Sequence, residues 1–539
     1  MTMIKSLILG SAAGIIALSG AQAADLPVKA KAVEYVRICS LYGAGFFYIP
    51  GTDTCIKLGG YVRVDTTFNG TTYGGPAWSG DIGQGNRFRD YYTARSRMAL
   101  TVDTRTATEY GVVRTFGQAD FQFDAFGNGT KNPNVLQALG VNSSLLSTAG
   151  GGYVGVEMVF IQFAGFTFGK SASAFATPWN GYPGNNNSFL MGGPDYVTGV
   201  NNIQYTAQFG NGVSGTIGLD DPTVFNRTSV WNMANGIGAT GAGVNAYAGV
   251  HAPDIAGNIR VDQAWGLFQI GAIAHLVNAS YNILGTSATG VAGVPTALSE
   301  ISGHPEDKWG GAVNVALQIK NLPTGAGDDF KIDATYAKGD TKAVIATSGP
   351  SPSFAMFGNT GLAGGYQSVG FGNTSDGLYA PPGTFGTGAG GSGIILTSAW
   401  GIRGAFNHNW DPYWSTSLWG SYAQVKYDGG ANDNLAGISS AKGIYCAAFA
   451  ASHPGQSAAP AAAGTYSCNP DFNVAQVGVV TRWTPVKNLT FSAEVGAFFL
   501  DQKMSGSSNF AAPAPKPTTL YEFKDQSTVF LNVRAQRNF

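Results

Sequence analysis

QSTVFLNVRAQRNF, residues Gln526 to Phe539, ends the chain and has the pattern that decides the fold. Apolar residues such as Val529, Leu531 and Val533 alternate with polar residues such as Asn532. Because side chains alternate between the two faces of a strand, this segment has one mostly apolar face and one polar face. A terminal strand of this kind that ends on an aromatic residue is typical of a transmembrane β-barrel. An edge strand of a soluble β-sandwich is the alternative that this segment alone leaves open.

The opposite end of the chain predicts export. Lys5 is followed by the uncharged apolar run Leu7–Leu18 and then by Ala21–Ala23, which has the A-x-A form of a cleavage site. This three-part pattern predicts a signal peptide at residues 1–23 and a mature chain that begins at Ala24. The apolar run is too short to span a bilayer comfortably as a retained helix.

The composition narrows the class of protein. Charged residues make up 12% of the chain, against about 25% in a typical soluble domain. The net charge of −1 argues against nucleic acid as a partner. The best candidate for a spanning helix, Gly266–Leu284, contains Gln269, His275 and Asn278 and alternates like a strand. We therefore expect strands rather than helices to cross a membrane.

Alternating segments of strand length recur along the whole chain. About sixteen such segments can be counted. Seven short turns and eight long loops, the loops rich in Gly, Asn, Ser and Pro, separate them. One of the short turns is predicted near Thr104–Thr108. The segments are Cys55–Phe68, Asp90–Asp103, Glu109–Phe123, Tyr153–Phe163, Gly165–Lys170, Val200–Phe209, Val213–Asp220, Asn258–Trp265, Gly266–Ser280, Lys308–Lys320, Phe330–Lys338, Ile395–Asn409, Tyr413–Tyr427, Phe472–Thr484, Leu489–Leu500 and Gln526–Phe539.

The asymmetry between turns and loops favours a membrane barrel. Outer-membrane barrels of a single chain have an even number of strands, short periplasmic turns and long extracellular loops, whereas a soluble sandwich has no reason to gather its long loops at one end. We predict an all-β, 16-stranded antiparallel transmembrane β-barrel over residues 56–539, preceded by an N-terminal segment at 24–55. The polar faces suit a water-filled lumen. Aromatic residues near the segment ends would form interfacial girdles: Tyr110, Trp265, Trp400, Trp483 and Phe539.

The four cysteines fall into two pairs that are close in sequence. Cys39 precedes Cys55, and Cys446 precedes Cys468. In an exported protein, each pair can close a short loop as a disulfide, which we prefer over free thiols. Neither spacing resembles a metal site.

Several apparent motifs carry no chemistry. Gly386–Gly391 satisfies G-x-G-x-x-G but lies in a Gly/Pro/Ser loop with no helix after it. Gly169–Ser171 resembles the end of a P-loop, but Ala164 occupies the position of the required first glycine. The five histidines are scattered. We therefore nominate no catalytic, cofactor-binding or metal-binding residue and expect that the protein is not an enzyme.

An electrostatic feature is the candidate functional site. Four arginines lie on the polar faces of the first three strands: Arg63, Arg95, Arg97 and Arg114. On adjacent strands they would form a positive patch on one wall of the lumen and act on passing ions. The alternative is that they face water or pair with aspartates on the same faces, namely Asp65, Asp103 and Asp120.

The long loop Ser171–Gly199 is the candidate for the other half of a constriction. It is rich in Gly, Asn, Pro and aromatic residues, among them Trp179 and Tyr182, and its one charged residue is Asp195. A large loop with so little charge has reason to pack inside the barrel. The alternative is an external loop that is buried between subunits.

The segment Val36–Arg63 contributes to a resemblance that extends over essentially the whole mature chain, and its stretch Cys39–Cys55 is the most specific part. With the signal peptide, Phe166–Lys170 before its long loop and the terminal Phe539, the chain resembles the alphaproteobacterial general porins. That resemblance implies an outer-membrane homotrimer in contact with lipid and lipopolysaccharide. Each barrel would have an inward-folded third loop and pass small hydrophilic solutes and ions without a cofactor.

The resemblance also implies site roles and leaves alternatives. The basic wall would be the four arginines named above, and Asp195 would be the acidic member of the constriction loop. A single acid on that loop departs from the usual porin pattern and predicts weak, anion-leaning selectivity. One alternative is a substrate-specific channel with an aromatic path. Another is an adhesin that uses its longest loops, Gly339–Gly393 and Asp428–Asp471.

Overall fold

The structure is a computed structural model. It describes residues 37–79, 83–124, 152–223, 226–288, 290–346, 352–430, 440–452 and 467–539. The predicted signal peptide at 1–23 and the predicted start of the mature chain at Ala24 lie outside the described residues.

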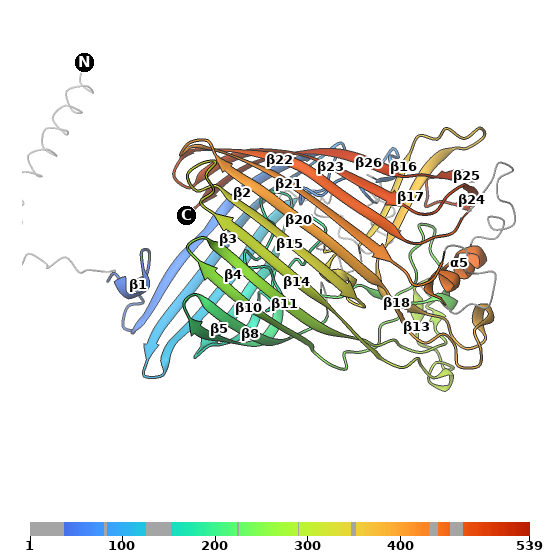
Figure 1. Cartoon of the computed structure of the whole chain (residues 1–539), viewed down its shortest axis with the longest axis horizontal. Coiled ribbons are helices and arrows are strands. Elements are labelled where there is room, and N and C mark those ends of the chain that lie inside the picture. The colour runs from blue at the N-terminus through green and yellow to red at the C-terminus, as the bar shows by residue number, and fades with distance from the viewer. Residues whose placement is uncertain are drawn as a thin grey trace, which may run out of the picture.

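Sixteen antiparallel strands of the described chain form one closed barrel, as predicted (Figure 1). Neighbours in the sheet are neighbours in sequence, and β26 closes the ring by pairing with β2, with Leu531 opposite Phe68 and Asn538 opposite Tyr61. The strands are β2 (Thr54–Phe68), β3 (Tyr92–Thr108), β4 (Gly111–Asp124), β5 (Tyr153–Phe163), β6 (Phe166–Ser171), β7 (Val200–Gly210), β8 (Val213–Asp220), β10 (Asp254–Gln263), β11 (Gly266–Val277), β14 (Lys308–Lys320), β15 (Asp329–Lys338), β20 (Ser398–Asn409), β21 (Trp414–Lys426), β22 (Phe472–Val486), β23 (Leu489–Gln502) and β26 (Gln526–Asn538).

The two faces of the barrel wall differ as the alternation predicts. Val62 and Val64 of β2 are 44% and 47% exposed on the outer face. Asp65, the next residue along the strand, points to the inner face and is 1% exposed. On β11, Ile270 is exposed on the outside and Gln269 is buried inside. All the backbone groups of such a wall pair within the ring, which lets a sheet cross hydrocarbon without an open edge.

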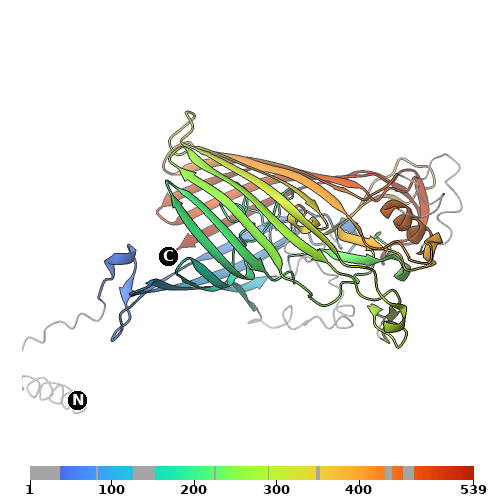
Figure 2. The ribbon, with the colours of Figure 1, turned by 60° about the horizontal axis from the view of Figure 1, so that its bottom comes forward.

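Short turns gather at one end of the barrel and long loops at the other (Figure 2). We call these the short-turn end and the long-loop end. The turn 211–212 joins β7 to β8 with positive φ at both Asn211 (50°) and Gly212 (74°), as a two-residue hairpin turn requires. The C-terminus lies at the short-turn end, where η1 (Ser40–Tyr42) and β1 (Phe47–Tyr48) also pack before β2.

The long loops contain structure that periodicity did not predict. Three small sheets and a helix lie at the long-loop end (Figure 1), where a buried cluster includes Trp231, Phe354, Tyr427 and Phe472. These elements are β9 (Ser229–Asn232), η2 (Met233–Asn235), β12 (Gly285–Thr286), β13 (Ala292–Val294), η3 (Glu300–Ser302), η4 (Thr341–Ala343), β16 (Ser353–Gly358), β17 (Gln367–Asn373), β18 (Ser375–Tyr379), η5 (Thr384–Gly386), β19 (Ile395–Leu396), α5 (Ala441–Ser452), β24 (Ser507–Ala511) and β25 (Thr518–Phe523).

Several predicted boundaries are wrong, among them those of the segment Asn258–Trp265, which the structure shows as β10 at Asp254–Gln263. The turn expected near Thr104–Thr108 is part of β3, and the chain reverses at residues 109–110, because Thr104 and its neighbours continue the ladder opposite β4. The segment expected to begin at Ile395 is also divided. Ile395 and Leu396 pair with β18 in a loop sheet, and the barrel strand begins at Ser398.

Both predicted disulfides are present. Cys39 is bonded to Cys55 with Cα atoms 6.1 Å apart, which ties the segment before the barrel to the start of β2. Cys446 of α5 is bonded to Cys468 with Cα atoms 5.8 Å apart, which closes the loop between β21 and β22.

Among the described residues, no helix has both the length and the apolar composition needed to cross a bilayer.

The outward position of Val495 gives a test of the fold. Val495 lies midway along β23 and is 46% exposed on the outer face. Val495→Arg should lower the free energy of unfolding by about 2–4 kcal/mol, the cost of a charge on a lipid-facing strand at mid-depth. Urea unfolding in lipid vesicles measures it. Thr206→Arg is the control, because Thr206 lines a polar hollow on the inside and should tolerate the charge. Equal destabilisation by both variants would contradict the assignment of faces.

Candidate functional site

The third long loop, residues 172–199 between β6 and β7, runs inside the barrel as predicted. Near its start, the amide of Asn258 on β10 donates to the carbonyl of Ala174 at 2.5 Å. The amide of Gln269 on β11 donates to the carbonyl of Ala176 at 2.7 Å. Both amides lie on inner-facing positions of strands several places around the ring, so the loop follows the inner wall.

The tip of the loop reaches the opposite wall. Glu494 of β23 is fully buried and accepts the backbone N–H groups of Asn186 at 2.9 Å and Asn187 at 2.8 Å. Gln476 of β22, also buried, accepts the N–H of Met191 at 2.9 Å. Carboxylate and amide groups of the wall therefore satisfy the backbone of a loop that has no sheet of its own.

A buried ion pair supports the returning half of the loop. Arg403 of β20 forms a salt bridge with Asp333 of β15 at 3.0 Å, and both side chains are excluded from solvent. The same guanidinium donates to the carbonyls of Leu190 at 3.2 Å and Pro194 at 2.7 Å. Sequence analysis did not select Arg403 or Glu494. The alternation of each strand places both side chains on the inner face, which the sequence does show. Nothing in the sequence indicated that the loop would contact them.

The predicted loop residues lie in this inner segment. The Tyr182 hydroxyl donates to Asp195 at 2.8 Å, and burial raises the pKa of Tyr182 well above its usual value. The N–H of Val197 donates to the other oxygen of Asp195 at 3.1 Å. Trp179 is half-buried. The carboxylate of Asp195 is thus held by a phenol and a backbone amide.

Lys342 is a further charged residue beside Asp195, and sequence analysis missed it. It comes from η4 in the loop after β15 and is 5% exposed. Burial lowers the pKa of Lys342 to about 8, and the charges of Asp195 and Asp376 oppose that shift. The electrostatic neighbour of the loop acid is therefore a lysine from another long loop.

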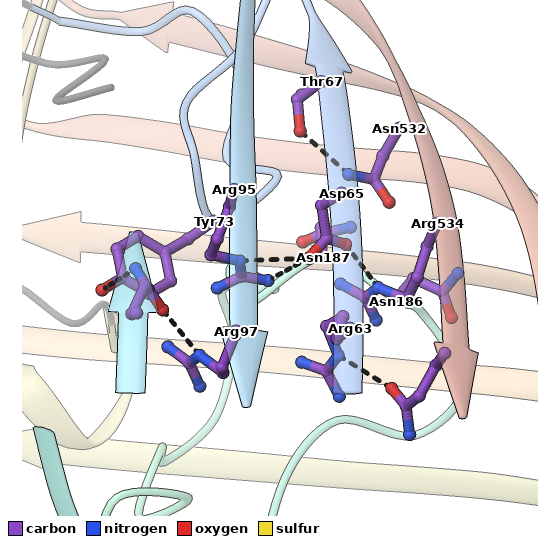
Figure 3. Close-up of polar contacts among 12 residues, drawn as sticks. Arg63, Asp65, Thr67, Tyr73, Arg95, Arg97, Asn186, Asn187, Asn532 and Arg534 are labelled. Atoms are coloured by element: carbon purple, nitrogen blue, oxygen red, sulfur yellow. Dashed lines mark hydrogen bonds and ion pairs between the residues drawn. The ribbon is translucent and has the colours of Figure 1, made fainter. Parts of the chain in front are cut away.

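All four predicted arginines lie on the inner face of adjacent strands. Arg63 of β2 is directly opposite Arg97 of β3, and Arg114 of β4 is directly opposite Arg105 of β3. Arg534 of β26 extends the row on the other side of β2 (Figure 3). We call the set Arg63, Arg95, Arg97, Arg105, Arg114 and Arg534 the arginine wall.

Carboxylates of the same strands pair with most of this wall. Asp65 bridges Arg95 at 2.6 Å and Arg534 at 2.5 Å (Figure 3). Asp103 bridges Arg105 at 3.1 Å and Arg114 at 3.0 Å. Two carboxylates thus serve four guanidiniums, so pairing leaves the wall with an excess of positive charge.

Arg97 and Arg63 differ in their partners. Arg97 contacts Asp120 at 2.5 Å and Glu157 at 3.4 Å. Arg63 donates to the neutral amide of Gln536 at 2.8 Å (Figure 3). No carboxylate of a described residue lies within 4.0 Å of Arg63. Among the four predicted arginines, Arg63 is therefore the one that pairing within the described chain does not neutralise.

Tyr73 from the first long loop covers part of the wall. Its ring lies 4.9 Å from the guanidinium carbon of Arg95 and 5.7 Å from that of Arg97. Its hydroxyl accepts from the amide of Gln122 at 3.1 Å. Arg95 is only 2% exposed under this cover, so its charge is shielded from the lumen.

Two hollows remain, one beside the loop and one beside the wall at the short-turn end. One of about 520 Å³ lies between the loop and β7, β8, β10 and β11, and Asn258 and Asp262 contribute to its lining. Another of about 510 Å³ is lined by Arg105 and Arg114. Thr206 and Gln208 line both hollows, so the two adjoin. The inner loop therefore leaves open space beside it, which continues toward the short-turn end of the barrel.

Comparison with known proteins gives three findings. A family model described as "Porin subfamily" matches residues 25–532. Porin Omp2b of Brucella abortus (strain 2308) is 36% identical over 267 residues, which are 49% of this chain and 63% of that protein. Porin Omp2b of Brucella suis is 36% identical over 271 residues, 49% of this chain and 64% of that protein. The match thus spans just under two thirds of the length of these relatives.

A solved structure shares the fold. The outer membrane channel DcaP of Acinetobacter baumannii has a TM-score of 0.51 and 14% sequence identity, and the superposition covers 91% of this chain and 99% of that chain. At this identity the likeness concerns the barrel architecture alone.

The contacts of Glu494 predict how the loop is held. Glu494→Gln replaces one accepting oxygen by an NH₂ group that cannot accept the N–H of Asn186 or Asn187, at an expected cost of about 1–3 kcal/mol. Hydrogen exchange should accelerate by about tenfold or more at whichever of the two amides faces the new NH₂ group, because the remaining oxygen can still accept from the other. Glu157→Gln, on the inner face of β5, is the matched control and should leave both amides protected. Unchanged exchange in Glu494→Gln would contradict the anchoring role.

Proposed function

The chain belongs to the porin subfamily that its family model describes, and from this premise we propose that it is a water-filled outer-membrane channel for the passive diffusion of small hydrophilic solutes and ions. The observation that carries the proposal is the combination of a closed barrel with a loop held across its interior by Glu494, Gln476 and Arg403. Such a loop narrows the lumen, and the adjoining polar hollows beside it supply the hydrated space.

The proposed mechanism uses no covalent step. Outward apolar side chains place the barrel in hydrocarbon, and inner polar side chains replace part of the hydration of a passing solute. Selection then depends on the width left by the loop and on the charge of its surroundings. The family suggests a channel rather than an enzyme.

The charge of the site favours anions weakly. The arginine wall has more guanidiniums than carboxylates, and Arg63 has a neutral partner. Asp195 is held by Tyr182, with the charge of Lys342 nearby, so it opposes the wall less than a free carboxylate would. We infer a constriction in which Arg63, Arg97 and Arg114 supply the positive side, while Arg95 acts mainly as a support for Asp65 and Tyr73.

The proposal includes placement and assembly. Residues 1–23 would direct export and be removed, residues 24–55 would lead into the barrel, and residues 56–539 would form it. The short-turn end would face the periplasm and the long-loop end the exterior, in contact with lipopolysaccharide. A homotrimer is the expected assembly and follows from the resemblance to general porins.

Conductance measurements test the function. The purified full-length protein in a planar bilayer should show stepwise openings, and the permeability of neutral sugars should fall continuously with their size. Saturation by one solute at low concentration would favour the substrate-specific alternative. An absence of conductance from protein that is folded by circular dichroism would overturn the channel itself.

The neutral partner of Arg63 predicts its effect on ion preference. Arg63→Gln should shift the zero-current potential in a salt gradient toward cation selectivity, and the shift should shrink at high salt because ions screen the wall. Arg537→Gln is the matched control. Arg537 is exposed at the end of β26 and donates to the carbonyl of Lys487, so its loss should leave the potential unchanged. An unmoved potential in Arg63→Gln would contradict the proposed positive side.

A further inference from the structure

A basic pocket lies on the outer surface of the barrel at the long-loop end, away from the lumen. It has a volume of about 900 Å³ and is formed by the ends of β14, β15, β20 and β21 with the loop after β21. Four lysines contribute to its lining: Lys308, Lys338, Lys426 and Lys442. None of them belongs to the arginine wall, so the proposed channel does not use this pocket.

The strand register places two of these lysines in one row. Ser398 of β20 is directly opposite Lys338 of β15 on one side and Lys426 of β21 on the other. Directly opposite residues on antiparallel strands are about 4.5–5.5 Å apart at their Cα atoms. Lys338 and Lys426 therefore lie on either side of Ser398 with their Cα atoms roughly 10 Å apart, so their long side chains can reach one phosphate group between them.

The charges of the pocket are unbalanced. Lys442 is buried and forms an ion pair with Asp471 at 2.7 Å. Asp428 is exposed at the edge. Lys338 and Lys426 are exposed and have no ion-pair partner among the described residues. Four lysines against two aspartates leave the lining positive.

The residues next to the lysine row fix its depth in a membrane. Tyr336 and Trp400 are directly opposite each other on β15 and β20, and each lies two residues from the lysine row toward the middle of the barrel. Both point outward and are 51% and 42% exposed. Ile402 follows on the same outer face and is 37% exposed. Aromatic side chains on the outer face of a barrel mark the boundary of the hydrocarbon. The lysines therefore lie just beyond that boundary, at the level of lipid phosphates.

We propose that this pocket binds a phosphorylated glycolipid of the outer leaflet, with its phosphate between Lys338 and Lys426 and an acyl chain along Trp400 and Ile402. The combination of a positive pocket with an adjoining apolar outer face fits an amphiphile with an anionic head better than a free anion, which would use the lysines only. The proposal rests on the proposed placement in the outer membrane. It adds to that proposal a specific lipid site on the strands β15, β20 and β21.

Native mass spectrometry of the full-length protein tests the site with bisphosphorylated lipid A as the probe. Lys338→Gln/Lys426→Gln should bind it about thirtyfold more weakly, equivalent to about 2 kcal/mol at 1.4 kcal/mol per tenfold change. Lys57→Gln/Lys487→Gln removes two exposed lysines at the short-turn end and is the matched control. Lipid A without phosphate should bind the wild type as weakly as the bisphosphorylated lipid binds the double variant.

Three results would overturn the proposal. They are equal binding by both double variants, complete displacement of the lipid by inorganic phosphate at millimolar concentration, and cross-linking that shows a second copy of the chain seated over Trp400. A lipid carrying brominated acyl chains should also quench wild-type fluorescence more than that of Trp400→Phe. Conductance separates the failure of the site from the failure of the channel: a wild-type protein that conducts but does not bind the lipid contradicts the site and leaves the channel function standing, and the lysine variants should conduct like the wild type.

Discussion

Closure of the sheet by pairing of β26 with β2 is the constraint on which the rest of the structure depends. A hydrocarbon environment offers no hydrogen-bond partner for an open strand edge, so a spanning sheet has to meet itself. Residues at the two ends of the chain, such as Asp65 and Arg534, thereby become neighbours across the seam. The arginine wall straddles this seam, which explains why its ion pairs link the first strand to the last.

The inner loop depends on the wall in a different way. A loop that crosses the interior cannot satisfy its backbone with its own ladder, so buried side chains of the wall do so: Glu494, Gln476 and Arg403. A buried charge is costly without partners. Here Glu494 accepts two backbone N–H groups of the loop, and Arg403 pairs with Asp333 while it donates to two loop carbonyls. The same groups that hold the loop therefore set the width of the space that remains.

The arrangement of charge differs from a simple opposition of basic wall and acidic loop. Much of the wall is paired internally, and Tyr73 covers Arg95. The acid of the loop is engaged by Tyr182, with Lys342 as a charged neighbour. What remains available to an ion is a modest positive excess, with Arg63 its least compensated member.

The sequence by itself determined the architecture. Alternation with period two is a local property, so the sequence alone predicts the outward row of Val62 and Val64 and the inward position of Asp65. It also predicts the sixteen strands, the two disulfides and the inner loop. Only the tertiary structure decided which groups meet. The register between strands decides that Arg95 pairs with Asp65. The path of each loop decides that Asn186 donates to Glu494 and that the charge of Lys342 interacts with Asp195. Register and loop path arise from contacts between residues far apart in the chain, and no local pattern encodes them.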